Sequence, residues 1–119
     1  MKIQHVSYGQ RIRELALSFP ETYEDAPWGS PVFKVGDNKM FALMSDGEAS
    51  VSLTVKLTAE EREIALHMPN VDVARYVGRY GWVTVHVGDD DSLDNALEWL
   101  RESYWLKAPA RLRSAVEET

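Results

Sequence analysis

The spacing of hydrophobic positions predicts a helix at the start of the chain, over about residues 7–19. Ser7 precedes this segment with Gln10 three positions later, which is a capping-box pattern, and Pro20 ends it. Apolar side chains recur three or four positions apart within it, at Ile12, Leu15, Ala16 and Phe19. We therefore expect an amphipathic helix with one face turned to a core.

Three segments with strand-like patterns follow, at residues 31–35, 39–45 and 49–57. Turn signals separate them, at residues 36–38 and at Asp46-Gly47, and short turns join antiparallel neighbours. The third segment alternates strictly, with Val51, Leu53, Val55 and Leu57 on one side and Ser50, Ser52, Thr54 and Lys56 on the other. This alternation predicts a strand with one covered face and one face open to solvent.

A second helix is predicted after Thr58, which has Glu61 at the capping-box position, and it extends to about residue 68. Residues 73–81 are interrupted by two glycines, so we expect an irregular strand or a loop there. Residues 82–87 alternate again. Three valines face inward in this segment, and the outward positions are Trp82, Thr84 and His86.

The third helix is expected to begin at Asp91 or Ser92 as its N-cap and to end before Pro109, with a further helical turn or two over residues 110–116. Trp99 lies off its main apolar stripe, which predicts a position at the helix edge or in a dimer contact, and a place in the core or an interface before any functional role. The stripe itself consists of Leu93, Ala96, Leu97, Leu100 and Tyr104.

This order of elements predicts the fold class α+β, a two-layer sandwich with helices on one face of an antiparallel sheet. A chain of 119 residues fits a single domain over residues 1–119. The third strand and the segment 82–87 would place their polar side chains on the open face of that sheet.

Charge and composition narrow the classes of function. The chain has 13 Lys and Arg against 19 Asp and Glu, a net charge of −6, and no cysteine. Disulfides and thiolate chemistry are thereby excluded, and the net charge opposes strong nonspecific binding to nucleic acid. No signal-peptide pattern or membrane-spanning run is visible, so we expect a cytoplasmic monomer or small homo-oligomer with no membrane partner.

Motifs for catalysis or metal binding are absent from the sequence. The three histidines are far apart, and the acidic run at residues 89–94 lacks the spacing of an EF-hand. There is no nucleophile elbow and no phosphate-binding glycine loop. We therefore predict no catalytic residue, no metal site and no cofactor, and an enzyme remains a third hypothesis without a defined set of residues.

Four segments, in order, resemble the MmcQ/YjbR family over roughly residues 10–115: FPETYEDAPWGSPVFKVGDNKMFALMS, VSLTV, YVGRYGWVTV and ESYWLKAPARL. The resemblance implies a frataxin-like (CyaY-like) fold, in agreement with the sandwich predicted above, and DNA binding. Many members have a lysine where this chain has Thr54, but Lys56 occupies the same strand face. The iron binding of frataxin itself is not expected here, because the first helix carries one acid, Glu14.

The first hypothesis is thus a non-enzymatic domain that binds DNA through the open sheet face. Basic residues would contact phosphate and one tryptophan would stack or wedge between bases. The predicted contacts are Lys34, Lys39, Lys56, Arg75, Arg79 and Trp82. The alternative is a protein-interaction or small-ligand module that uses Trp28, Trp82 and the loop 78–81. Between Pro27 and Gly29, Trp28 is expected to lie over the edge of the core.

Overall fold

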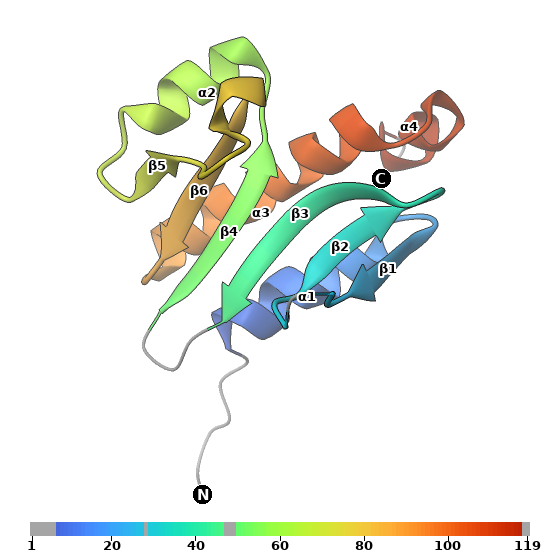
Figure 1. Ribbon diagram of the computed structural model, residues 1–119, viewed down its shortest axis with the longest axis horizontal. Coiled ribbons are helices and arrows are strands. Elements are labelled where there is room, and N and C mark those ends of the chain that lie inside the picture. The colour runs from blue at the N-terminus through green and yellow to red at the C-terminus, as the bar shows by residue number, and fades with distance from the viewer. Residues whose placement is uncertain (1–6, 28, 47–49, 118–119) are drawn as a thin grey trace, which may run out of the picture.

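The computed structural model describes residues 7–27, 29–46 and 50–117, with side chains as far as residue 113. Helices pack on a six-stranded antiparallel sheet (Figure 1), which confirms the predicted α+β class. The elements in chain order are α1 (Tyr8–Ser18), β1 (Thr22–Asp25), β2 (Val32–Val35), β3 (Lys39–Asp46), β4 (Val51–Lys56), α2 (Ala59–Leu66), β5 (Val71–Val73), the 3-10 turn η1 (Gly78–Tyr80), β6 (Trp82–Val87), α3 (Asp90–Lys107) and α4 (Ala110–Glu117).

The strand order is β1-β2-β3-β4-β6-β5, so β1 to β4 form a meander and β6 returns beside β4. Antiparallel pairing aligns side chains across the open face in rows, for example Leu43 opposite Thr54 and Thr54 opposite Thr84. The two threonine hydroxyls are 2.8 Å apart and hydrogen-bonded. The polar face predicted for β4 and β6 is therefore continuous between these strands.

The hydrophobic core lies between the other face of the sheet and the helices. The inward residues of β4 and β6 belong to it as predicted, together with the apolar stripe of α3. Trp99 also belongs to this core and is 4% exposed, and its indole Nε1 donates a hydrogen bond to Glu61 of α2 at 3.0 Å. Of the positions expected for Trp99, the core is confirmed, and Glu61 of α2 reaches that side of α3.

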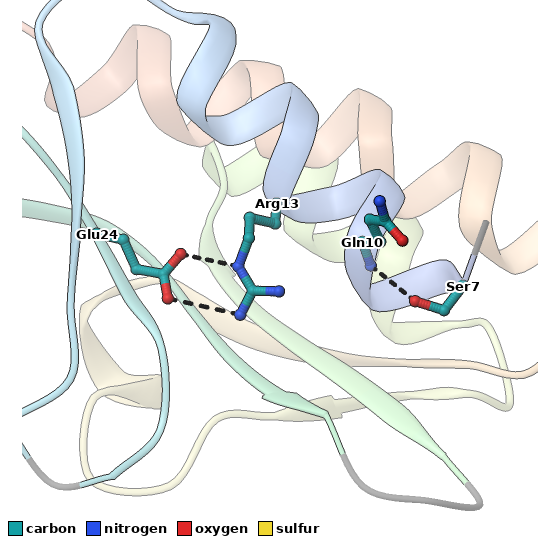
Figure 2. A network of polar contacts seen from close by, with 4 residues as sticks. All are labelled: Ser7, Gln10, Arg13 and Glu24. Carbon is teal, nitrogen blue, oxygen red and sulfur yellow. Dashed lines mark hydrogen bonds and ion pairs between the residues drawn. The ribbon is translucent and has the colours of Figure 1, made fainter.

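The predicted caps of α1 and α2 are confirmed, and the cap of α3 differs. The backbone N–H of Gln10 donates to Ser7 Oγ at 3.1 Å (Figure 2), and Thr58 caps α2 in the same way. The cap of α3 is Asp89, not Asp91 or Ser92. Its carboxylate accepts from the Ser92 backbone at 2.7 Å, and the Ser92 hydroxyl accepts from the Asp89 backbone in return.

The strand β1 was not predicted from the sequence. Its residues, TYED, have no apolar alternation, because β1 is an edge strand that pairs only with β2. Arg13 of α1 holds it from the helix side through an ion pair with Glu24 at 2.8 Å (Figure 2). The expected position of Trp28 lies outside the described residues.

Candidate functional site

The residues predicted to contact a ligand belong to elements that meet at one end of the sheet. At this end β2, β4 and β5 finish and β3 and β6 begin, and for β2, β3 and β4 it lies toward the upper right of Figure 1. Lys39 begins β3, Lys56 ends β4, and Trp82 begins β6 directly opposite Lys56. Arg75 and Arg79 lie in the connection from β5 to β6. Four of the six predicted contacts are thus exposed or half-exposed cations at this end.

Two further cations, Arg62 and Lys107, belong to the same end and were not among the predicted contacts. A side-chain carbon added at Gly81 would lie 3.5 Å from Arg62 Nη1 and 3.9 Å from Lys56 Cε, so both side chains border this glycine. Lys107 ends α3, where the chain reaches the start of β3. We call the whole set the basic end: Lys39, Lys56, Arg62, Arg75, Arg79 and Lys107.

Like charges at the basic end perturb one another. The pKa of Lys107 is lowered, first by partial burial and then by the positive charges of Lys56 and Lys39. In the described part of the chain, no cation of the basic end forms an ion pair. Two nearby acids have other partners: Glu102 accepts from the Thr58 backbone at 3.0 Å, and Glu61 accepts from Trp99. The cations of the basic end therefore form no ion pair within these residues, although two carboxylates lie near them.

Lys34 differs from these cations because it already forms an ion pair within the protein. Its Nζ donates to Asp25 at 3.1 Å and to Asn38 at 2.7 Å, and its side chain is 15% exposed. The bond from Lys34 and a bond from the Ala26 backbone lower the pKa of Asp25. Lys34 thus joins β1 to β2 and is poorly placed to contact a ligand.

Trp82 does not fit its predicted role as a stacking residue. Strand alternation puts it on the open face as expected, but it is 6% exposed. Ala74 pairs with it through a backbone hydrogen bond of 3.2 Å, and η1 contacts β6, so the connection between β5 and β6 closes against the start of this strand. Its ring is therefore not available for stacking on a base.

Two exposed aromatic side chains near the basic end are tyrosines that sequence reasoning missed. Tyr76 is 92% exposed and Tyr80 is 57% exposed, and both lie in the connection between β5 and β6. The guanidinium of Arg79 lies over the Tyr80 ring, 4.8 Å from its centroid. The signal in the sequence was an acid-free segment, ARYVGRYG, in which each arginine precedes a tyrosine.

Residues 7–27, 29–46 and 50–117 hold neither a cluster of metal ligands nor a membrane-spanning helix. No group of three or more histidine or acidic side chains there is placed to hold a metal ion. The acidic run at residues 89–94 forms the cap and first turn of α3, and His86 pairs with Asp72 at 3.0 Å. None of the helices in these segments has the length and apolar character needed to cross a bilayer.

Comparisons with known proteins identify relatives in sequence and in structure. The YjbR family model matches residues 17–106. The crystal structure of Deinococcus radiodurans protein DR2400, with a DUF419 domain, is similar with a TM-score of 0.72 and 24% identity, over 89% of this chain and 85% of that one. A Pseudomonas syringae protein is similar with a TM-score of 0.62 and 19% identity, over 86% and 99%. No curated protein matches the chain significantly.

Proposed function

This chain belongs to the YjbR family, and on that premise we propose that it is a non-enzymatic domain that binds the phosphate backbone of DNA through its basic end. One observation carries the proposal: cations from α2, α3, β3, β4 and the connection between β5 and β6 converge without ion-pair partners among the described residues. A cation that is buried or ion-paired contributes to the stability of the fold. A cluster of cations that form no ion pair instead attracts an anionic ligand.

Part of the acidic charge behind the net charge of −6 lies far from the basic end, although Glu61 and Glu102 lie near it. Asp46 ends β3 and Asp89 to Asp91 begin α3, all at the opposite end of the sheet. The six residues of β4 separate the two ends by about 17 Å at 3.3 Å per residue. Salt at about 0.1 M screens charges beyond about 10 Å, so a phosphate at the basic end interacts mainly with nearby cations.

The proposal is tested by titrating fluorescently labelled single-stranded and duplex DNA with the protein at two salt concentrations. Binding should weaken steeply with salt, because each phosphate contact releases counterions. If four cations of the basic end contact a single strand, the slope of log K against log salt is about −3. Absence of binding to both DNA forms at low salt would overturn the proposal.

A pair of variants locates the interface. Lys56→Gln combined with Arg79→Gln should weaken DNA binding by about tenfold or more, because two charge-assisted phosphate contacts are lost. Arg11→Gln serves as the control, since Arg11 is an exposed cation of α1. If Arg11→Gln lost as much DNA affinity as the Lys56→Gln/Arg79→Gln variant, binding would depend on total charge and not on the basic end.

The alternative, a protein-interaction module, has its own supporting observation. Val73, Tyr76 and Tyr80 are 59%, 92% and 57% exposed and lie within eight positions of one another. Exposed apolar groups of this kind also occur in protein interfaces. A protein partner would remain bound to the Lys56→Gln/Arg79→Gln variant, and its binding would depend weakly on salt.

A further inference from the structure

The connection between β5 and β6, residues 74–81, combines exposed aromatic rings with exposed cations. Tyr76 and Tyr80 each follow an exposed arginine, Arg75 and Arg79. No acid occurs anywhere in residues 73–88, so the rings stand in a locally positive segment. Exposure of an aromatic ring to water costs free energy. Two exposed rings on one short connection therefore indicate a contact surface.

The backbone at Tyr76 is held in an unfavourable conformation. Its φ is +65°, in the left-handed region that side chains with a Cβ rarely adopt. The Val77 N–H donates to the Arg75 carbonyl at 2.6 Å, which closes a three-residue γ-turn around Tyr76. Backbone strain of this kind persists where surrounding bonds maintain it, and it concentrates at functional sites.

Backbone hydrogen bonds fix the rest of the connection. Tyr80 N–H donates to Val77 O at 2.9 Å, and Gly81 N–H donates to Gly78 O at 3.0 Å. The Gly81 carbonyl accepts from Leu57 N–H at 3.1 Å, which ties the connection to the end of β4. A side chain at Gly78 would clash with Val73, so the close packing needs glycine there. The two rings are therefore presented by a preorganised backbone, which lowers the entropy cost of binding.

We infer that Tyr76 and Tyr80 stack on unpaired bases while Lys56, Arg75 and Arg79 contact phosphates, so that the preferred ligand is single-stranded nucleic acid. This inference rests on the proposed function and adds to it the form of the ligand. Tyrosine rings beside a positively charged surface are the combination that binds single strands without sequence preference. In a duplex the faces of the bases are already stacked on each other and are not accessible to these rings.

The experiment compares ligands that share a phosphate backbone and differ in their bases. Fluorescence anisotropy would measure binding of the whole chain to labelled oligothymidylate of about 15 nucleotides, a length within the usual range of single-strand sites. The same backbone with abasic sugars and a thymine–adenine duplex of equal length complete the set. The variants are Tyr76→Ala/Tyr80→Ala, Tyr76→Phe/Tyr80→Phe, and the control Tyr23→Ala, an exposed tyrosine on edge strand β1.

The native chain should bind oligothymidylate about tenfold or more tightly than the abasic strand, and more tightly than the duplex, because stacking contributes only with unpaired bases. The double alanine variant should lose about tenfold for oligothymidylate and nothing for the abasic strand. The double phenylalanine variant and Tyr23→Ala should stay within about twofold of the native chain, because Phe keeps a ring for stacking.

Equal affinity of the native chain for oligothymidylate and the abasic strand would overturn the inference without any substitution. Binding to duplex as tight as binding to the single strand would also overturn it. Both results would leave the proposed phosphate contacts intact, since those are reported by salt dependence and by Lys56→Gln/Arg79→Gln. Absence of binding to every ligand at low salt would overturn both proposals together.

Discussion

We call the end of the sheet where β3 and β6 finish the acidic end: Asp46, Asp89, Asp90 and Asp91. Acidic side chains there contact other groups of the protein, whereas the cations of the basic end form no ion pair among the described residues. Asp89 caps α3, and Asp90 accepts a hydrogen bond of 3.4 Å from Tyr8 at the start of α1. The carboxylate of Asp46 packs so closely on the first turn of α1 that a side chain at Gly9 would clash with it.

Like charges perturb one titratable group at each end, in opposite directions. The pKa of Tyr8 is raised by desolvation and then by the carboxylates of Asp90 and Asp89. The pKa of Lys107 is lowered by partial burial and then by Lys56 and Lys39. The orientation of α3 favours this arrangement, because its N-terminus lies at the acidic end and its C-terminus at the basic end.

The difference between the ends lies in the use of the charges. At the acidic end, the Asp89 carboxylate caps α3, and Asp90 and Asp91 lie in its first turn, where negative charge stabilises the helix. At the basic end, the cations repel one another and form no ion pair within the described residues. On the function proposed above, the arrangement that costs stability at the basic end would be retained for binding.

The largest effect on stability is expected from Ser103→Ala, which removes the buried support of the basic end. The Ser103 hydroxyl accepts from Lys56 N–H at 2.9 Å and donates to the Phe41 carbonyl at 2.6 Å, and Ser103 is fully buried. Loss of both bonds should lower the free energy of unfolding by about 1–3 kcal/mol in urea titrations. Ser18→Ala, at an exposed helix position, should change it by less than about 0.5 kcal/mol.

Gly81→Ala, at the basic end, should destabilise the protein more than Gly88→Ala, the corresponding substitution at the acidic end. Gly81 has a φ of +95°, and an added side chain would meet the Leu57 carbonyl at 3.4 Å. The left-handed backbone alone costs alanine about 1–2 kcal/mol. At Gly88 a side chain would meet no atom within 4 Å, and Gly88→Ala should be close to neutral in thermal unfolding. Equal effects at the two glycines would contradict the strain argument.

The acidic end should show its contribution through pH. Hydrogen bonds from the Ser92 backbone and then its hydroxyl lower the pKa of Asp89. The folded pKa is therefore below the unfolded one, so the cap stabilises above the unfolded pKa and its contribution is lost as pH falls through the folded pKa. Asp89→Asn retains a capping oxygen without a titrating charge, and its stability should fall less between about pH 5 and pH 2. If the stability of Asp89→Asn fell with pH in parallel with that of the native chain, this role of Asp89 would be contradicted.

The smallest effect is expected from Lys107→Gln, and its sign is the informative part. Removal of one of several mutually repelling cations should raise the free energy of unfolding in urea titrations slightly, by less than about 0.5 kcal/mol, because solvent screens these charges. The same variant should bind DNA more weakly, since a phosphate contact is lost. A decrease in both stability and affinity would show that Lys107 serves the fold, and the comparison between the two ends would lose one of its supports.

Periodicity was sufficient to predict most of the elements of this fold. Strict alternation located β4 and β6 to within two residues, and the caps at Ser7 and Thr58 were confirmed as hydrogen bonds. The edge strand β1 was missed because an edge strand needs only one backbone neighbour and carries no apolar alternation. The cap at Asp89 was missed by two or three positions, since several consecutive polar residues can each begin a helix.

The candidate site was less predictable, because burial on an open sheet face depends on what packs against it. Alternation placed Trp82 on the correct face but did not show that the connection before it would close against the start of β6. Arg62 and Lys107 come from helices distant in sequence, so only the packing of α2 and α3 brings them to the end of the sheet. Lys34 looked like a free cation because its partner Asp25 lies on the strand that was not predicted.

The two outer strands of the sheet also bear on how the protein behaves in concentrated solution. An unpaired edge is a template on which a second copy adds its own strand, and long flat apolar edges lead to aggregation. Here one edge is the three-residue β5 and the other is the four-residue β1, which carries the charged side chains Glu24 and Asp25. Two short edges, one of them with charged side chains, thus oppose the addition of strands from a second copy.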